Sequence, residues 1–212
     1  MTGIRAAWRR WSVSPPLIRL TRARITLQWL LAGKPVPAPP VVKQRTVIGY
    51  QRRHRLRTFV ETGTYTGEMV QAMNGHVEQI ISIEVAPALH ERAAARFAGQ
   101  RHIRLLQGDS ATLLPAVLTT LDGPALFWLD GHYMGGESGR GTEDTPVMAE
   151  MAALLGHTMR GHVVLIDDAR LFDGTGGYPR LHEFTAWVKT QRPGTDVTID
   201  GDIIRCVFDA EG

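Results

Sequence analysis

The stretch Arg57–Gly67, RTFVETGTYTG, decides the fold of this chain. Thr58–Glu61 carries the short apolar run expected of a parallel strand that is covered on both faces. Gly63 and Gly67 follow, and glycines let the backbone bend tightly and approach a ligand at the start of a helix. The next predicted strand, Gln79–Glu84, ends in an acid. A glycine turn after one strand and an acid at the tip of the next is how doubly wound folds hold a nucleoside.

Strands and helices alternate along the rest of the chain. Further strands are expected at Ile103–Gln107, Ala125–Asp130 and His162–Asp167. Residues 197–208 contain an Asp-Gly pair between two β-rich runs, which is typical of a hairpin. Alternation of this kind predicts a parallel sheet with right-handed crossovers. We therefore predict an α/β fold, with a doubly wound, mostly parallel seven-stranded sheet that closes with an antiparallel hairpin.

Charge divides the chain near residue 60. Residues 1–60 contain thirteen Lys or Arg and no acid, whereas the remaining residues contain eleven basic and twenty-one acidic side chains. Residues 1–33 hold two basic helical patterns separated at Ser14-Pro15-Pro16, and the proline-rich residues 34–40 form a stiff connector. We therefore predict a basic helical arm with its connector over residues 1–40 and an α/β domain over residues 41–212.

Two interpretations of the arm stay open. It packs on its own domain or on a partner subunit in a homo-oligomer, or it lies on an anionic membrane surface through its Trp and Leu side chains. The sequence contains no run of 18 uncharged apolar residues, so we predict no transmembrane helix. The single cysteine, Cys206, excludes an intramolecular disulfide and a cysteine-cluster zinc site, and its apolar context predicts a core residue. We expect a cytoplasmic protein, with membrane association through the arm as the open alternative.

Acidic side chains follow all five predicted parallel strands. One such acid is unremarkable because Asp often caps the next helix, but acids at five tips exceed what capping requires. Carboxylates that cluster repel one another, so ligand hydroxyls, a cationic ligand or a metal should offset them. The acids are Glu61, Glu84, Asp109, Asp130 and the pair Asp167-Asp168.

The acids after the fourth and fifth strands form a group of their own. Oxygen ligands from Asp130, Asp167 and Asp168 suit a hard divalent cation such as Mg²⁺. In the alternative, Asp130 acts without a metal and the Asp pair forms a turn. His132 stands two residues beyond Asp130, where a histidine can accept a proton near neutral pH, although a plain loop histidine is an equal alternative. The glycine-rich loop that follows, with Arg140, is expected to bind substrate or to act as a lid.

These residues resemble the class I S-adenosylmethionine-dependent methyltransferases. The run Glu61–Gly67 is similar to that family's acid-x-Gly-x-Gly-x-Gly motif, with Tyr65 in place of the middle glycine. Ile83-Glu84 resembles its ribose-binding acid, and Gly108-Asp109-Ser110 its adenine-side motif. The resemblance covers residues 41–208 and implies a Rossmann-like methyltransferase fold. The residues it implies for S-adenosyl-L-methionine are Glu61, Gly63, Thr64, Tyr65, Gly67, Glu84, Asp109, Ser110 and Asp130.

Within that class, the acids after the fourth and fifth strands are similar to those of the metal-dependent, macrocin-type sugar O-methyltransferases, and also to a widespread group of related uncharacterised proteins. The resemblance implies Mg²⁺ held by Asp130, Asp167 and Asp168, and O-methylation of a hydroxylated, sugar-like small molecule. It implies Asp130 and His132 as catalytic residues, with His132 at the position of the proposed base. The macrocin-type enzymes carry an acid at that position, so the histidine is a departure.

Two other functions stay open. A nicotinamide-dependent oxidoreductase also uses a strand, a glycine turn and a later acid, but the Gly-x-Gly-x-x-Gly pattern is not present. The second open function is that of a methyltransferase-like binding protein, which is catalytically idle and is tethered by its basic arm. Nucleic acid is not expected as the substrate, because the domain is acidic and no Asn-Pro-Pro-Tyr base-flipping motif follows the fourth strand.

Overall fold

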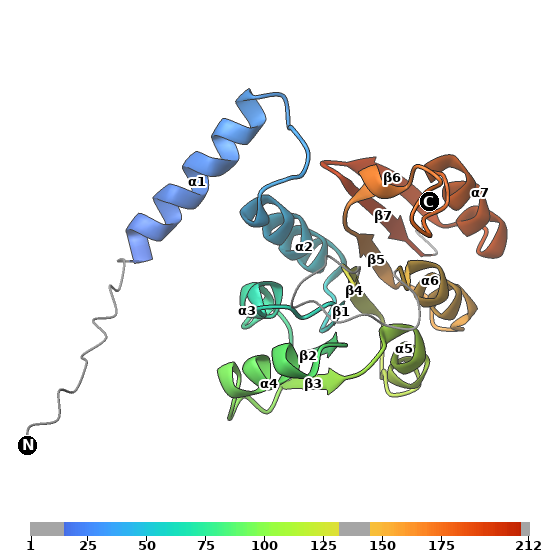
Figure 1. The fold of residues 1–212 in the computed structure, drawn as a ribbon, viewed down its shortest axis with the longest axis horizontal. Helices are drawn as coiled ribbons and strands as arrows, with labels where there is room; N and C mark the ends of the chain where they lie inside the picture. Colours follow the sequence, from blue (N-terminus) through green and yellow to red (C-terminus); the bar gives the residue numbers. More distant parts are fainter. Residues whose placement is uncertain (1–14, 132–144, 209–212) are drawn as a thin grey trace, which may run out of the picture.

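The computed structural model describes residues 15–131 and 145–208, with side chains from residue 20 onward. Seven strands of this part form one sheet in the order β3-β2-β1-β4-β5-β7-β6 (Figure 1). β1 to β5 are parallel, and β7 is antiparallel to both β5 and β6. The predicted doubly wound sheet with its closing antiparallel hairpin is therefore confirmed. The strands are β1 (Thr58–Thr62), β2 (Gln79–Glu84), β3 (Ile103–Gln107), β4 (Ala125–Leu129), β5 (Val163–Ile166), β6 (Asp196–Asp200) and β7 (Ile203–Val207).

Helices cover both faces of the sheet (Figure 1). α2 and α3 pack on one face of the sheet, together with Phe97, the residue that follows α4. α5, α6 and α7 pack on the other face. α1 lies outside both layers, as Figure 1 shows. The helices are α1 (Pro15–Leu31), α2 (Pro40–His54), α3 (Glu68–Met73), α4 (Pro87–Arg96), α5 (Ser110–Leu118), α6 (Val147–Gly156) and α7 (Leu181–Gln191), with a 3₁₀ turn η1 at Ala169–Leu171. None of the helices described is long and apolar enough to span a bilayer.

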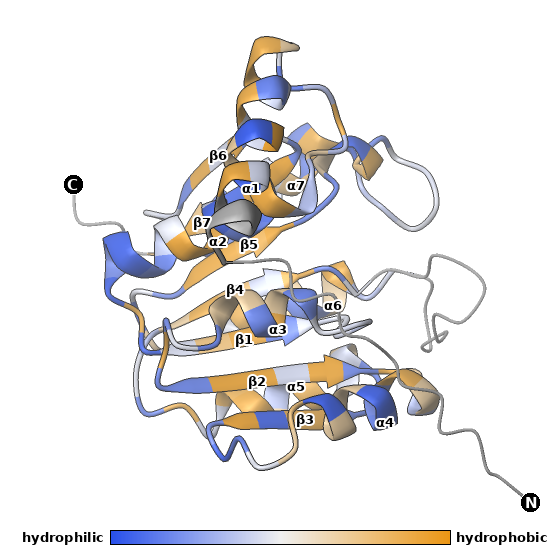
Figure 2. Cartoon of the chain, turned by 90° about the vertical axis from the view of Figure 1, so that its left-hand side faces the viewer, coloured by the Kyte–Doolittle hydropathy of each residue, from blue (hydrophilic) through white to orange (hydrophobic). Residues whose placement is uncertain are grey.

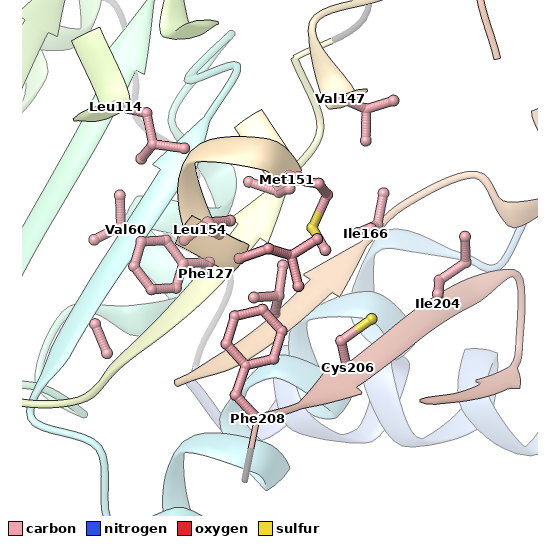
Figure 3. Close-up of a cluster of buried hydrophobic side chains, with 14 of the residues drawn as sticks. Val60, Leu114, Phe127, Val147, Met151, Leu154, Ile166, Ile204, Cys206 and Phe208 are labelled. Carbon is pink, nitrogen blue, oxygen red and sulfur yellow. The ribbon is translucent and has the colours of Figure 1, made fainter. Parts of the chain in front are cut away.

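The core forms because alternate residues of the central strands point to opposite faces. In β1, Phe59 joins the cluster under α2 and α3, and Val60 joins the larger cluster under α5, α6 and α7. Figure 3 shows the larger cluster, in which Phe127, Met151 and the free Cys206 are fully buried. Cys206 is a core residue, as predicted, and its burial raises the pKa of the thiol to about 12. In Figure 2 the strands are largely hydrophobic, as expected for a sheet covered on both faces.

The register of the sheet brings the strand tips level with one another. Thr62 at the end of β1 lies beside Ile83 of β2 and beside Leu129 of β4. Leu129 in turn lies beside Ile166, the last residue of β5. Because parallel strands share one carboxyl edge, the residues that follow these four strands meet there.

The end of α1 is anchored to the domain. Trp29 is buried with Ala38, Val41 and Val42, and its indole nitrogen donates a 2.8 Å hydrogen bond to the Pro35 carbonyl oxygen. Further contacts join Lys34 to Asp200 at 3.0 Å and Arg45 to Thr26 at 2.8 Å. These contacts fix the last turns of α1 against α2 and against the loop between β6 and β7.

Candidate active site

The turn after β1 is held by backbone hydrogen bonds to β2. The amides of Gly63 and Thr64 donate to the Ile83 carbonyl oxygen at 2.9 and 3.3 Å. Gly63 and Gly67 have φ angles of +83° and +75°, a region that glycine enters without steric cost. Tyr65 has φ +47° and is exposed, so it keeps a left-handed conformation of the kind that a glycine adopts freely.

Glu61 lies beneath this turn. It is 2% exposed, and its carboxylate accepts a 2.6 Å hydrogen bond from the Ser82 hydroxyl. The hydroxyls of Ser82 and Thr64 are also 2.6 Å apart, so the three side chains form one chain of hydrogen bonds. Burial raises the pKa of Glu61 well above its ordinary value, and the charges of Asp130 and Glu84 add to the shift. Glu61 thus supports the turn from within the domain.

Glu84 joins the tip of β2 to the same turn. Its carboxylate accepts hydrogen bonds from the backbone amides of Tyr65, at 2.7 Å, and Ala86, at 2.9 Å. Each carboxylate oxygen has a further lone pair, so the group can still accept hydrogen bonds from ligand hydroxyls. The predicted role of Glu84 toward ribose is compatible with these contacts.

The predicted adenine-side residues lie next to Glu84. The Gly108 amide donates to the Glu84 carbonyl oxygen at 2.9 Å. Asp109 caps α5 by accepting a 2.9 Å hydrogen bond from the Ala111 amide, and Ser110 is buried in the first turn. The β1 turn, the tip of β2 and the start of α5 therefore form one continuous edge.

Asp130, Asp167 and Asp168 converge beside that edge. Ligand-capable oxygens of the three carboxylates all lie within 4.8 Å of one another. The strand ladder positions them, because the Asp130 amide bonds the Thr62 carbonyl at 3.2 Å and the Asp167 amide bonds the Leu129 carbonyl at 3.0 Å. Three hard oxygen donors at this spacing fit a divalent cation such as Mg²⁺.

Lys43, which the sequence analysis missed, reaches this group of acids from α2. Its ammonium pairs with Asp167 and lies 3.4 Å from Asp168 Oδ1. Arg170 contacts the same Asp168 oxygen at 2.7 Å and also pairs with Asp202. Burial disfavours the Lys43 ammonium, but Asp167, Asp168 and Asp130 outweigh it, so the pKa of Lys43 is raised. Two cationic side chains, Lys43 and Arg170, therefore already contact the acids that would hold a cation.

Two of the acids, Asp130 and Asp167, are difficult to ionise. Burial raises the pKa of Asp167 to about 6 although Lys43 opposes the shift. Burial and the neighbouring Asp167 raise the pKa of Asp130 well above its ordinary value. Two carboxylates that repel each other in a buried site favour a cationic ligand between them.

Glu150 is a second site residue that the sequence analysis missed. It is 1% exposed on α6, and a side chain built on Gly131 would lie 3.5 Å from its Oε1. Glu150 Oε1 and Thr62 Oγ1 have no hydrogen-bond partner among the residues described. A small pocket that Glu150 shares with Asp130, Asp167 and Tyr178 opens beside them. Polar atoms of this kind are usually satisfied by water or by a bound group.

Glu150→Gln is expected to stabilise the protein at neutral and higher pH. Burial raises the pKa of Glu150 from 4.5 to about 7, and the nearby Ser110 hydroxyl only partly opposes the shift. The free energy of unfolding of the wild type should therefore fall by about 2 kcal/mol as the pH rises from 5 to 7, because the folded state must release the Glu150 proton. Gln carries no charge to desolvate, so the variant should lack this loss. Urea unfolding at pH 5 and pH 8 measures the difference, and identical pH profiles would contradict the assignment.

The predicted base, His132, and Arg140 lie outside the residues that the structure describes. The other predicted residues meet at one edge: the turn of Glu61, Gly63, Thr64, Tyr65 and Gly67, with Glu84, Asp109, Ser110 and the three acids Asp130, Asp167 and Asp168. Their roles toward a cofactor or metal stay predictions.

The sequence matches none of the family models and none of the curated proteins with which we compared it. Solved structures do match. An O-methyltransferase from Bacillus cereus, in complex with S-adenosylhomocysteine, has a TM-score of 0.60 at 13% identity, over 89% of this chain and 90% of that one. An S-adenosylmethionine-bound O-methyltransferase of tomaymycin synthesis, from Streptomyces achromogenes, has a TM-score of 0.58 at 16% identity, over 88% of each chain.

A methyltransferase from Podospora anserina, also bound to S-adenosylhomocysteine, has a TM-score of 0.59 at 16% identity, over 92% of this chain and 88% of that one. This chain has the class I methyltransferase fold. The seven-stranded, mostly parallel sheet and its antiparallel β7 match the class I methyltransferase fold. The same fold accounts for the level carboxyl edge on which the candidate site is built.

Proposed function

We propose that this protein is an S-adenosylmethionine-dependent methyltransferase that methylates a hydroxyl group of a small, sugar-like molecule with the help of a divalent cation. One observation carries the proposal. Gly63 lies so close to Asp130 that a Cβ at Gly63 would overlap the Asp130 carbonyl oxygen and lie 2.9 Å from its carbon. The turn proposed for the cofactor is thus directly beside the acids proposed for the cation.

The roles of the residues follow from this adjacency. Glu84 would hold the ribose hydroxyls, and the glycine turn would let the backbone approach the methionine part. Asp109 and Ser110 would lie on the adenine side. Methyl transfer is an in-line displacement, so holding an acceptor oxygen in place supplies much of the rate. Asp130, Asp167 and Asp168 would orient that acceptor.

The same three acids would hold the cation, with Lys43 as its competitor. A bound cation would lower the pKa of an acceptor hydroxyl. His132 follows Asp130 by two residues, which makes it our proposed acceptor of the hydroxyl proton.

Calorimetry with S-adenosylhomocysteine tests the cofactor. We expect saturable binding by the wild-type protein and none to NADH under the same conditions. Binding of NADH without binding of S-adenosylhomocysteine would favour a nicotinamide-dependent oxidoreductase. Binding of neither ligand would favour a catalytically idle binding protein. Once an acceptor is known, methylation should fall with EDTA and return with Mg²⁺. Turnover that EDTA leaves unchanged would remove the cation from the proposal.

Lys43→Met is expected to tighten Mn²⁺ binding about tenfold, because it removes a competing charge next to Asp167 at nearly constant side-chain volume. Calorimetry or the paramagnetic signal of free Mn²⁺ measures the affinity without any substrate. Arg45→Met, on the same helix, removes a charge that contacts Thr26 instead and serves as the control. Unchanged or weaker Mn²⁺ binding in Lys43→Met would contradict the competition.

A further inference from the structure

α1 presents a stripe of leucines to solvent. Leu20, Leu27 and Leu31 are 67%, 57% and 79% exposed. Their spacing of seven and four residues places them on one side of the helix. Trp29 lies on the opposite side and is buried against α2. The helix is therefore held to the domain by one side, and its leucine stripe lies on the exposed side. Figure 1 shows α1 itself apart from the helices that cover the sheet.

The charge of α1 has a single sign. Arg22 and Arg24 are exposed on the helix, and no acid occurs anywhere in residues 1–60. The domain that follows has the opposite balance, with eleven basic and twenty-one acidic side chains after residue 60. Leucines together with arginines, and no acid, require a partner that is both apolar and negatively charged.

The globular part of a second copy does not meet this requirement. Within residues 32–131 and 145–208, the large apolar side chains that are exposed are Val36, Tyr65 and Ile199. Val36 belongs to the connector, Tyr65 to the glycine turn and Ile199 to β6. The described body thus offers scattered apolar residues, not the contiguous patch that a leucine stripe needs.

Pairing of α1 with α1 of another copy is disfavoured by charge. Coiled-coil helices usually place oppositely charged side chains beside the apolar seam, where they choose the partner. Every charged residue of α1 is an arginine, so two copies side by side would repel each other.

We propose that α1 docks on the surface of a bilayer that contains anionic lipid. The leucine stripe (Leu20, Leu27 and Leu31) enters the boundary between headgroups and acyl chains, and Arg24, which lies beside the stripe on the helix, pairs with lipid phosphates. Because Trp29 and Lys34 fix the helix to the domain, docking holds the candidate active site close to the membrane. The proposal is independent of the methyltransferase chemistry.

Co-sedimentation of the full chain with vesicles tests the proposal. We expect binding to phosphatidylcholine vesicles that contain phosphatidylserine, weaker binding at high salt, and little binding to phosphatidylcholine alone. The triple variant Leu20→Gln, Leu27→Gln, Leu31→Gln should lose affinity for the anionic vesicles by about tenfold or more. Arg24→Gln should also weaken binding to the anionic vesicles.

Two controls make the result decisive. Ile199→Gln changes an exposed apolar residue outside α1 and should bind vesicles as the wild type does. Binding of S-adenosylhomocysteine by the triple variant should equal that of the wild type, which separates this test from the proposed function. Equal vesicle binding by the triple variant and the wild type would overturn the proposal. So would a wild-type dimer, seen by analytical ultracentrifugation, that the triple variant converts to monomers.

Discussion

Gly63→Ala is expected to destabilise the protein by about 4 kcal/mol and to abolish binding of S-adenosylhomocysteine. The residue has φ +83°, where a side chain costs about 1 kcal/mol. The new methyl group would also overlap the Asp130 carbonyl, and backbone cannot rotate away as a side chain can, so we add about 3 kcal/mol for overpacking. Relief of the overlap requires the β1 turn to separate from β4, which would dismantle the candidate site.

Urea unfolding and calorimetry measure these two effects. Gly75→Ala is the matched control, because Gly75 has nearly the same φ, +88°, but a Cβ there meets nothing within 4 Å. Gly75→Ala should lower the free energy of unfolding only by the conformational cost of a side chain at positive φ, about 1 kcal/mol, and should leave binding of S-adenosylhomocysteine intact. Equal losses in the two variants would show that the Gly63–Asp130 approach is not what shapes the site.

Glu84→Ala should weaken binding of S-adenosylhomocysteine by roughly 10²- to 10⁴-fold, since a carboxylate that accepts hydrogen bonds from two ribose hydroxyls contributes about 1.5–3 kcal/mol through each. The carboxylate also orders the turn through the Tyr65 and Ala86 amides, so part of the loss comes from the turn. Glu84→Gln keeps one acceptor oxygen and should fall between the alanine variant and the wild type.

Glu78→Ala is the matched control for this prediction. Glu78 precedes β2, next to the end of the strand away from Glu84, and pairs with Arg57 on the surface. Exposed ion pairs contribute little, so this variant should bind the ligand and unfold almost as the wild type does. If calorimetry gave Glu84→Ala the affinity of Glu78→Ala, Glu84 would have no part in nucleoside binding.

The strand tips could be predicted from sequence because their signals are local. Short β-rich runs, each ending at or followed by an acid, were enough to place Glu61, Glu84, Asp109 and Asp130 at one edge. The strand boundaries of the structure differ slightly from the predicted ones. β4 ends at Leu129 and not at Asp130, and β5 spans Val163–Ile166, inside the predicted strand His162–Asp167. The ladder continues past β4 all the same, since the Asp130 amide still bonds Thr62.

Two site residues escaped prediction for different reasons. Lys43 meets Asp167 across 124 residues of sequence, and nothing in the local pattern of α2 distinguishes it from a lysine in solvent. Glu150 did give a signal, because it occupies the same helical stripe as the buried Val147, Met151 and Leu154. An acid on an apolar stripe is costly to bury, so its presence there indicates a specific local need.

The first turn of α2 has two neighbours at once. Its Val41 and Val42 pack against Trp29, and the next residue, Lys43, reaches Asp167. The contacts that hold α1 to the domain and the ion pair that neutralises Asp167 therefore come from consecutive residues of one helical turn. A substitution at Val41 or Val42 that displaces this turn would also displace the Lys43 ammonium from the acids.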